Sequence, residues 1–284
     1  MTRAARRRMS AGLIWAGTFL MMVVICLPGL WVILSAFRPN REILAKPPDW
    51  SPDLTLINFI RMFGLGGEQI AIPVLEYFRN SLVIATTSTI IALLIGMSGG
   101  YAFARFRFRF KNSLFLGLML FRAVPGIALS LPLFMLWSRL GLIDTQLGLI
   151  IVYVSLNVPF TLWLIDGFFR QIPVSLSEAA QVDGCTRWQA FWRIEFPLAR
   201  PGIAAAGMFA FLMSWNEFAV ASQLTRSTDS KTLTVGLMDF TAQFTIDWAG
   251  MCAMAVIIIV PALILTFIVQ KHLIAGLTFG GVKG

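Results

Sequence analysis

Few side chains in this sequence could carry out catalysis or bind a metal. The three cysteines, Cys26, Cys185 and Cys252, are far apart, and their spacing fits neither a disulfide framework nor a zinc site. The one histidine, His272, directly follows an apolar run, where an interfacial residue is more common than a metal ligand. We therefore expect no catalytic residue, no metal site and no cofactor.

The glycine-rich end of the sequence has a superficial likeness to a phosphate-binding loop. That loop needs the pattern G-x-x-x-x-G-K-[ST] at the start of a helix, whereas Val282 follows Gly281 here. The chain is therefore not expected to bind ATP. The net charge of +9 does not indicate nucleic-acid binding either, because the basic residues fall in short loops between apolar runs, where they set membrane topology.

Four polar side chains interrupt the apolar runs and are candidates for contact with a solute. Arg122 lies near the middle of the third run, Asn157 is central in the fourth, and Asn216 and Glu217 lie in the outer half of the fifth. Charged residues inside membrane spans are rare and usually functional. Either these groups line a path for a hydroxylated solute, or Arg122 and Glu217 form an ion pair that only packs the helices, and the sequence leaves both open.

The polar stretch 177–197, SEAAQVDGCTRWQAFWRIEFP, lies between two apolar runs. Pro173 argues against a continuous helix from the preceding run. Ser175 and Glu178 match a capping box, which predicts a helix that begins at Ser175, and Gly184 is suited to end it.

A second amphipathic helix is expected in RWQAFWRI, and Pro197 and Pro201 are expected to end it before the fifth apolar run. The prediction is two short helices at an angle on the membrane surface. From composition alone they could be an interfacial linker or a docking element for another protein.

The spacing within this stretch favours docking. The pattern E-A-A-x3-G-x9-I-x-φ-P resembles the EAA loop of the transmembrane subunits of bacterial ABC importers, although Phe196 stands where that family more often has leucine. The resemblance implies coupling helices that sit in a cleft of a separate ATP-hydrolysing subunit. The residues that would make this contact are Glu178, Ala179, Ala180, Asp183, Gly184, Ile194 and Pro197.

The ending HLIAGLTFGGVKG is similar to the tail of the maltose-type second permease subunit of carbohydrate ABC importers. In that subfamily the tail inserts between the two ATPase subunits, which would place Gly280, Gly281, Lys283 and Gly284 at the contact. Taken alone, such a glycine-rich end would more simply be a disordered tail.

The resemblance implies an all-α membrane protein with the type I ABC importer permease fold and cytoplasmic coupling helices. Its partners would be a second homologous permease subunit, two ATP-binding subunits, and a periplasmic or lipid-anchored solute-binding protein. The solute would be a sugar or a related polyhydroxylated compound. A polyol or a sugar phosphate is an alternative solute, and a secondary transporter that works without an ATPase is an alternative mechanism.

The rest of the sequence supplies the membrane helices that would position these residues. The chain has 284 residues, of which 57% are hydrophobic and 13% charged, a balance typical of a multi-spanning membrane protein. We read a single permease domain over 1–284 with six spans, each long enough to cross a bilayer as a helix. The predicted spans are 11–37, 81–104, 113–136, 146–165, 202–221 and 249–270.

The distribution of lysine and arginine predicts the orientation of these spans. The N-terminus, the loop 105–112, the region 166–201 and the C-terminus carry most of the basic residues, so these segments are expected in the cytoplasm. The segment 38–80 is then a periplasmic loop, 175–197 the cytoplasmic coupling loop and 273–284 a cytoplasmic tail. The first apolar run is too long for the core of a cleaved signal peptide, so it is expected to remain as a helix.

Overall fold

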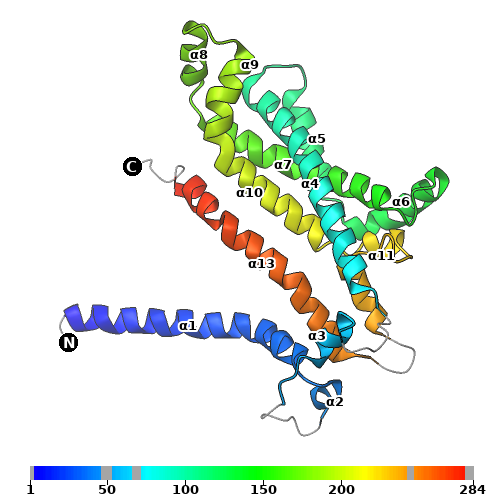
Figure 1. Cartoon of the computed structure of the whole chain (residues 1–284). Coiled ribbons are helices and arrows are strands. Elements are labelled where there is room, and N and C mark those ends of the chain that lie inside the picture. Colours follow the sequence, from blue (N-terminus) through cyan, green and yellow to red (C-terminus); the bar gives the residue numbers. More distant parts are fainter. Residues whose placement is uncertain (1–2, 46–52, 66–71, 242–245, 279–284) are drawn as a thin grey trace. The chain divides into compact units, whose positions relative to one another are not determined.

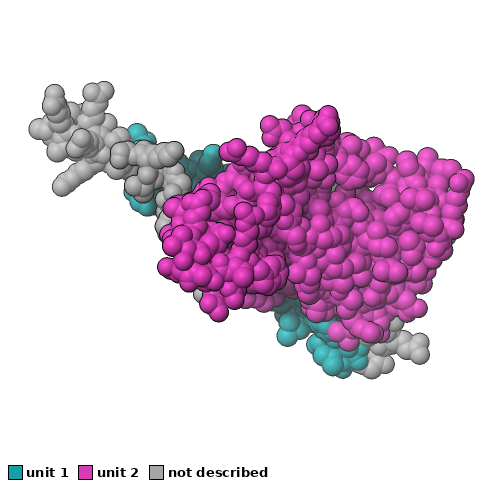
Figure 2. All heavy atoms as spheres, turned by 90° about the horizontal axis from the view of Figure 1, so that it is seen from above, with its two compact units in different colours: residues 1–72, 237–259 teal, residues 73–236, 260–284 magenta. Residues whose placement is uncertain are grey.

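The computed structural model describes residues 3–45, 53–65, 72–241 and 246–278, and the side chains of 12–45, 53–65, 72–241 and 246–270. Within these ranges the chain is helical, and its only β-type pairing is an isolated bridge between Thr241 and Ile246. The all-α class is therefore confirmed (Figure 1). The chain divides into two compact units, residues 1–72 with 237–259 and residues 73–236 with 260–284, which Figure 2 shows in separate colours.

The first unit begins with the long apolar helix α1 (Arg3–Ala36), followed by α2 (Asn40–Ile43) and α3 (Ile57–Met62). The turn after α1 is fixed by Asn58, whose Nδ2 donates to the carbonyls of Ala36 and Arg38, both at 2.8 Å. The unit also contains the 3-10 helix η2 (Leu237–Phe240) and the first part of α13 (Trp248–Thr278).

The second unit is built on three long helices that pack on one another, α4 (Val74–Arg105), α7 (Gln146–Gln171) and α10 (Phe196–Trp215) (Figure 1). Glycines in α4 allow α7 to approach closely. A Cβ atom on Gly96 would lie 2.3 Å from Thr161 Oγ1, and one on Gly100 would lie 2.9 Å from the backbone nitrogen of Asp166. These small residues therefore serve helix packing, as expected within membranes.

Shorter elements complete the second unit. They are α5 (Lys111–Arg122), α6 (Gly126–Leu140), α8 (Val174–Val182), α9 (Arg187–Ala190), the π-helical segment η1 (Phe191–Glu195), α11 (Ala221–Leu224) and α12 (Leu233–Gly236). Buried apolar side chains from α4, α6, α7, α11 and α12 form one core cluster, and a second cluster joins α7 to η1 and α10.

Five helices in the described chain are long and apolar enough to cross a membrane, or six if the bent pair α5–α6 counts as one span. The predicted span over 113–136 is not one continuous helix. The axes of α5 and α6 differ by 92° across a break at residues 123–125. Pro125 is the N-cap of α6, and because proline lacks an N–H and clashes with the preceding turn, it favours a break here.

Candidate functional site

The first helix of the stretch 177–197 ends in a tight glycine turn. The N–H of Cys185 donates to the carbonyl of Ala180 at 2.9 Å, and the N–H of Gly184 donates to Gln181 at 3.1 Å. This pair of bonds is the Schellman motif, which needs a left-handed residue, and Gly184 supplies it with φ of +91°. The prediction that Gly184 ends this helix is confirmed.

The helix starts differently from our expectation. α8 begins at Val174 with Pro173 as its N-cap and has no side-chain cap, so the predicted capping box of Ser175 and Glu178 is wrong. Pro173 has no N–H and a fixed φ, so it defines the helix start before Ser175 can act as the cap.

A capping box does form at the second helix. The N–H of Thr186 donates to Gln189 Oε1 at 2.8 Å, and the N–H of Gln189 donates to Thr186 Oγ1 at 3.2 Å. These reciprocal bonds fix the start of α9 directly after the glycine turn.

The second helix does not stop at Pro197 and Pro201 as predicted. α9, η1 and α10 form one run over Arg187–Trp215 that is apolar enough to span a membrane. Within it the N–H of Phe196 bonds to the carbonyl of Phe191, one residue further back than in an α-helix. This wider turn lies next to Pro197, in the first turn of α10, where a missing N–H is tolerated.

The seven residues predicted to contact an ATPase differ in exposure. Glu178, Ala179, Asp183 and Gly184 are exposed, whereas Ile194 and Pro197 are half-buried. Ala180 is buried at 6% exposure, because its small side chain packs within this chain. Two large apolar side chains outside this set of seven are exposed nearby, Val182 at 87% and Trp188 at 68%.

A buried ion pair holds this segment to the end of α4, and the sequence reading missed it. Arg105 Nε donates to Glu195 Oε2 at 3.1 Å and Arg105 Nη2 donates to the carbonyl of Ile172 at 3.0 Å. The other oxygen of Glu195, Oε1, accepts from the hydroxyl of Ser177 in α8. The side chains of Arg105 and Glu195 are only 10% and 2% exposed.

The ion pair between Arg122 and Glu217, one of the two alternatives that the sequence left open, does not form. The Arg122 guanidinium lies 4.4 Å from the centre of the Phe160 ring and contacts Met213 Sδ at 3.8 Å. The Glu217 carboxylate has other hydrogen-bond partners. It accepts from the hydroxyl of Tyr153 at 3.0 Å and from the backbone N–H groups of Val220 and Ala221, which the start of α11 leaves without a partner inside the helix.

The two predicted asparagines have different surroundings. Asn157 is buried, and its Nδ2 donates to Ser214 Oγ at 2.8 Å. Ser214 in turn bonds to Ser88 at 3.1 Å, so this chain of polar groups joins α7, α10 and α4. Asn216 is exposed and donates to the carbonyl of Leu212 within its own helix. Of the four solute-path candidates, Arg122 and Asn216 are the exposed ones.

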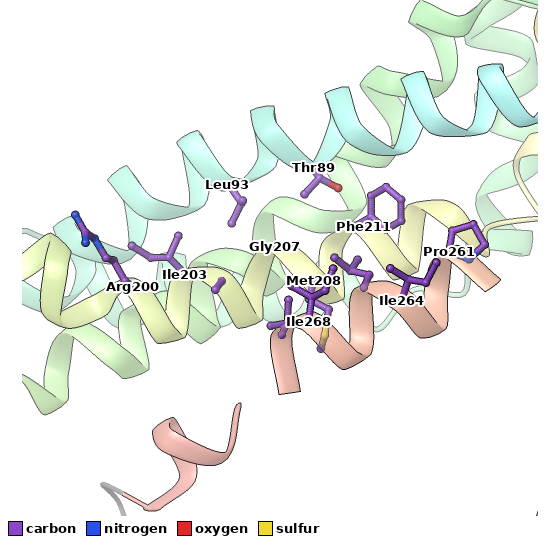
Figure 3. Close-up of a pocket in the computed structure, with 13 residues that line it drawn as sticks. Thr89, Leu93, Arg200, Ile203, Gly207, Met208, Phe211, Pro261, Ile264 and Ile268 are labelled. Carbon is purple, nitrogen blue, oxygen red and sulfur yellow. The ribbon is translucent and has the colours of Figure 1, made fainter. Parts of the chain in front are cut away.

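An open pocket of about 740 Å³ lies beside α4, α10 and the second part of α13 (Figure 3). Leu93, Ile203, Met208 and Ile264 are among the side chains that line it. Only Thr89 and Arg200 contribute polar side chains to this lining, so the pocket offers few hydrogen-bond partners to a hydroxylated solute.

The loop between α11 and α12 is fixed by Asp144, a residue between α6 and α7. Its Oδ1 accepts from the N–H groups of Arg226 and Ser227 and from the hydroxyl of Ser230. Partial burial raises the pKa of Asp144, but the hydrogen bonds from Ser230, Ser227 and Arg226 outweigh it and bring the pKa down to about 2.

The remaining predictions concern the tail and metals. Gly280, Gly281, Lys283 and Gly284 lie outside the described residues. Within the described part of the chain, no group of three or more His, Cys, Asp or Glu side chains could hold a metal ion.

Comparison with known proteins assigns the family. Over 281 residues the chain is 31% identical to the diacetylchitobiose uptake system permease protein DasC of Streptomyces coelicolor, covering 98% of this chain and 100% of that protein. It is 33% identical over 261 residues to the trehalose transport system permease protein SugB of Mycobacterium tuberculosis, covering 91% and 92%.

The fold is also similar to that of a chain of known structure. A chain in the crystal structure of a bacterial ABC transporter involved in the import of the acidic polysaccharide alginate superposes with a TM-score of 0.74, at 19% identity, over 95% of this chain and 98% of that one. Residues 92–278 match the family model itself. The chain belongs to the family of binding-protein-dependent transport system inner membrane components.

Proposed function

We propose that this chain forms half of the translocation pore of an ATP-driven importer for a sugar or a related polyhydroxylated solute. A second homologous permease would supply the other half, and two separate ATP-binding subunits would hydrolyse the ATP. The family, and the relatives named for diacetylchitobiose uptake and for trehalose transport, support this proposal.

The observation that carries the proposal is the exposed helix–turn–helix formed by α8 and α9. It has a fixed turn at Gly184 and exposes Val182 and Trp188. Exposed apolar side chains on an ordered surface often mark a protein contact. Because α9 continues into α10 without a stop, movement of a docked partner would reach a membrane-spanning helix directly.

The orientation follows from the charge distribution. The basic residues favour a cytoplasmic position for both termini and for α8 and α9, the side on which ATP-binding subunits would act. A periplasmic or lipid-anchored binding protein would deliver the solute from the other side. The tail residues Gly280, Gly281, Lys283 and Gly284 would then contact the ATPases.

In this arrangement ATP-driven closure of the ATPases would move the coupling segment and turn the pore from inward-open to outward-open. Arg122 remains the main candidate for solute contact within the membrane, because its guanidinium can donate several hydrogen bonds to hydroxyl groups. Asn157 and Glu217 would act indirectly, by holding α4, α7, α10 and α11 in place.

The test is co-purification from native membranes in mild detergent, with an affinity tag on the N-terminus. The wild-type chain should bring down a second permease and ATP-binding subunits. The double variant Glu178→Ala/Gly184→Asp should keep the permease and lose the ATPases, because its changes are confined to the exposed coupling segment. A wild-type chain that is recovered alone or as a homo-oligomer would favour the secondary transporter.

A further inference from the structure

The carboxylate of Glu195 joins two elements through its two oxygens. Oε2 binds Arg105 at the last residue of α4, and Oε1 binds Ser177 in the first half of α8. Arg105 extends the link to the end of α7 through the carbonyl of Ile172. One buried group therefore sets the angle of α8 relative to the ends of two membrane-spanning helices.

Aromatic packing supports the same junction from the side of the membrane. The ring of Tyr101, one turn before Arg105 in α4, lies 4.7 Å from the Phe191 ring in η1 and 5.3 Å from the Phe169 ring in α7. Both sets of contacts join α4, α7 and η1, and α8 is tied to them through the Ser177–Glu195 hydrogen bond. The junction is therefore a packed unit and not a single surface contact.

The chemistry of the Arg105–Glu195 ion pair suits it to orienting α8 more than to stabilising the fold. Removing two charges from water offsets much of the free energy gained from their attraction, and apolar residues of similar volume are often equally stabilising. A hydrogen-bonded carboxylate, however, specifies direction, because each of its oxygens must meet a donor at a fixed place. Apolar packing alone would allow α8 to tilt or slide.

We propose that Arg105, Glu195 and Ser177 are positioning residues that make α8 and the cytoplasmic end of α4 one rigid body. A displacement of α8 by a docked ATPase is then passed to α4 as well as to α10. This inference rests on the proposed importer function, since that function supplies the displacement.

The test measures one distance within the chain in the purified complex with its ATPases. Nitroxide labels are placed at Ser175→Cys in α8 and Ile90→Cys in α4, both exposed positions, after Cys26, Cys185 and Cys252 are replaced by serine. Double electron–electron resonance then measures the distance between the two labels in the nucleotide-free state and in the state trapped by ATP and vanadate.

We call Arg105, Glu195 and Ser177 the anchor. With the anchor unsubstituted, we expect a single narrow distance between the labels that is the same in both states. Glu195→Gln removes the charge but keeps the size, and should give a broadened or second distance in the trapped state. Ser177→Ala, which leaves the ion pair intact, should give a smaller broadening and provides a second variant if Glu195→Gln does not fold.

Asp166→Asn is the matched control. Asp166 and Arg170 also form an ion pair near this end of the unit, at 2.8 Å, and Arg170 is 52% exposed. Both belong to α7, and Arg170 donates to the carbonyl of Phe103 in α4 at 3.2 Å, so this pair links α7 to α4 and not α4 to α8. Its loss should leave the label distance unchanged.

Three results would overturn the inference. Unchanged label distances in both Glu195→Gln and Ser177→Ala would show that the anchor is not needed. A broadening of equal size in Asp166→Asn would show a general loss of stability. A label distance that changes between the two states when the anchor is unsubstituted would show that α8 and α4 move separately. If no ATPase accompanies the wild-type chain, the proposed function fails, and that failure is seen before any distance is measured.

Discussion

The left-handed turn at Gly184 gives the most direct test of the local structure. A Cβ atom at this position would meet no other atom within 4 Å, so substitution by alanine creates strain only in the backbone, at φ of +91°. For residues other than glycine the left-handed conformation costs about 1–2 kcal/mol. That energy corresponds to a change of roughly 5- to 30-fold in the population of an opened state.

Hydrogen exchange of the Cys185 amide measures this opening, because that N–H closes the turn onto Ala180. Gly184→Ala should speed its exchange by roughly 5- to 30-fold. Gly184→Asn should have a smaller effect, because asparagine tolerates the left-handed region, and Gly184→Val should have a larger one.

Gly167→Ala is the control. Gly167 lies within the helix α7 and also has open space at its Cβ, so alanine should leave exchange at Cys185 unchanged and favour the helix slightly. If Gly184→Ala exchanged at the wild-type rate, or if asparagine were as damaging as valine, the turn would not depend on a left-handed residue and our account of it would be refuted.

Three further predictions concern other contacts. Gly96→Ala should lower the thermal stability of the purified chain by about 1–3 kcal/mol, because the new methyl group overlaps Thr161; an unchanged melting temperature would contradict the close packing of α4 on α7. The stability that ionised Asp144 contributes should be fully present above about pH 4 and lost as the pH falls towards 2, since the pKa of Asp144 is lowered from 3.8 to about 2. Amide exchange in residues 226–230, corrected for the intrinsic pH dependence, should show this loss in the wild type and not in Asp144→Asn. Reversing the charges of Arg122 and Glu217 together should not rescue the single reversals in an uptake assay, because each side chain has other partners; rescue would show that the two do pair.

Local signals in the sequence predicted several features well. The apolar runs indicated the membrane helices, because twenty or so apolar residues have few other stable environments. Gly184 was correctly identified as a helix end, since few other residues fit a Schellman turn.

The errors arose where neighbouring contacts decide the outcome. Pro197 and Pro201 are strong helix breakers in sequence, yet Pro197 lies in the first turn of α10, next to the wide turn of η1, and Pro201 lies within the helix. The positions of Arg122 and Glu217 in the sequence gave no sign that the Glu217 carboxylate would accept hydrogen bonds from Tyr153 and from the start of α11. Arg105 and Glu195 are 90 positions apart, and no periodicity connects residues at that separation.

The π-helical segment η1 also sets how far α9 is rotated about the helix axis relative to α10. Its hydrogen bond encloses one more residue than that of an α-helix, and each residue of an α-helix advances the chain by about 100° around the axis. Deleting one residue from η1 would therefore restore regular α-helix and rotate α9 by about 100° relative to α10. The exposed faces of α9 would then point about a quarter-turn away from their present direction, so the length of this five-residue segment is itself a determinant of which surface is presented.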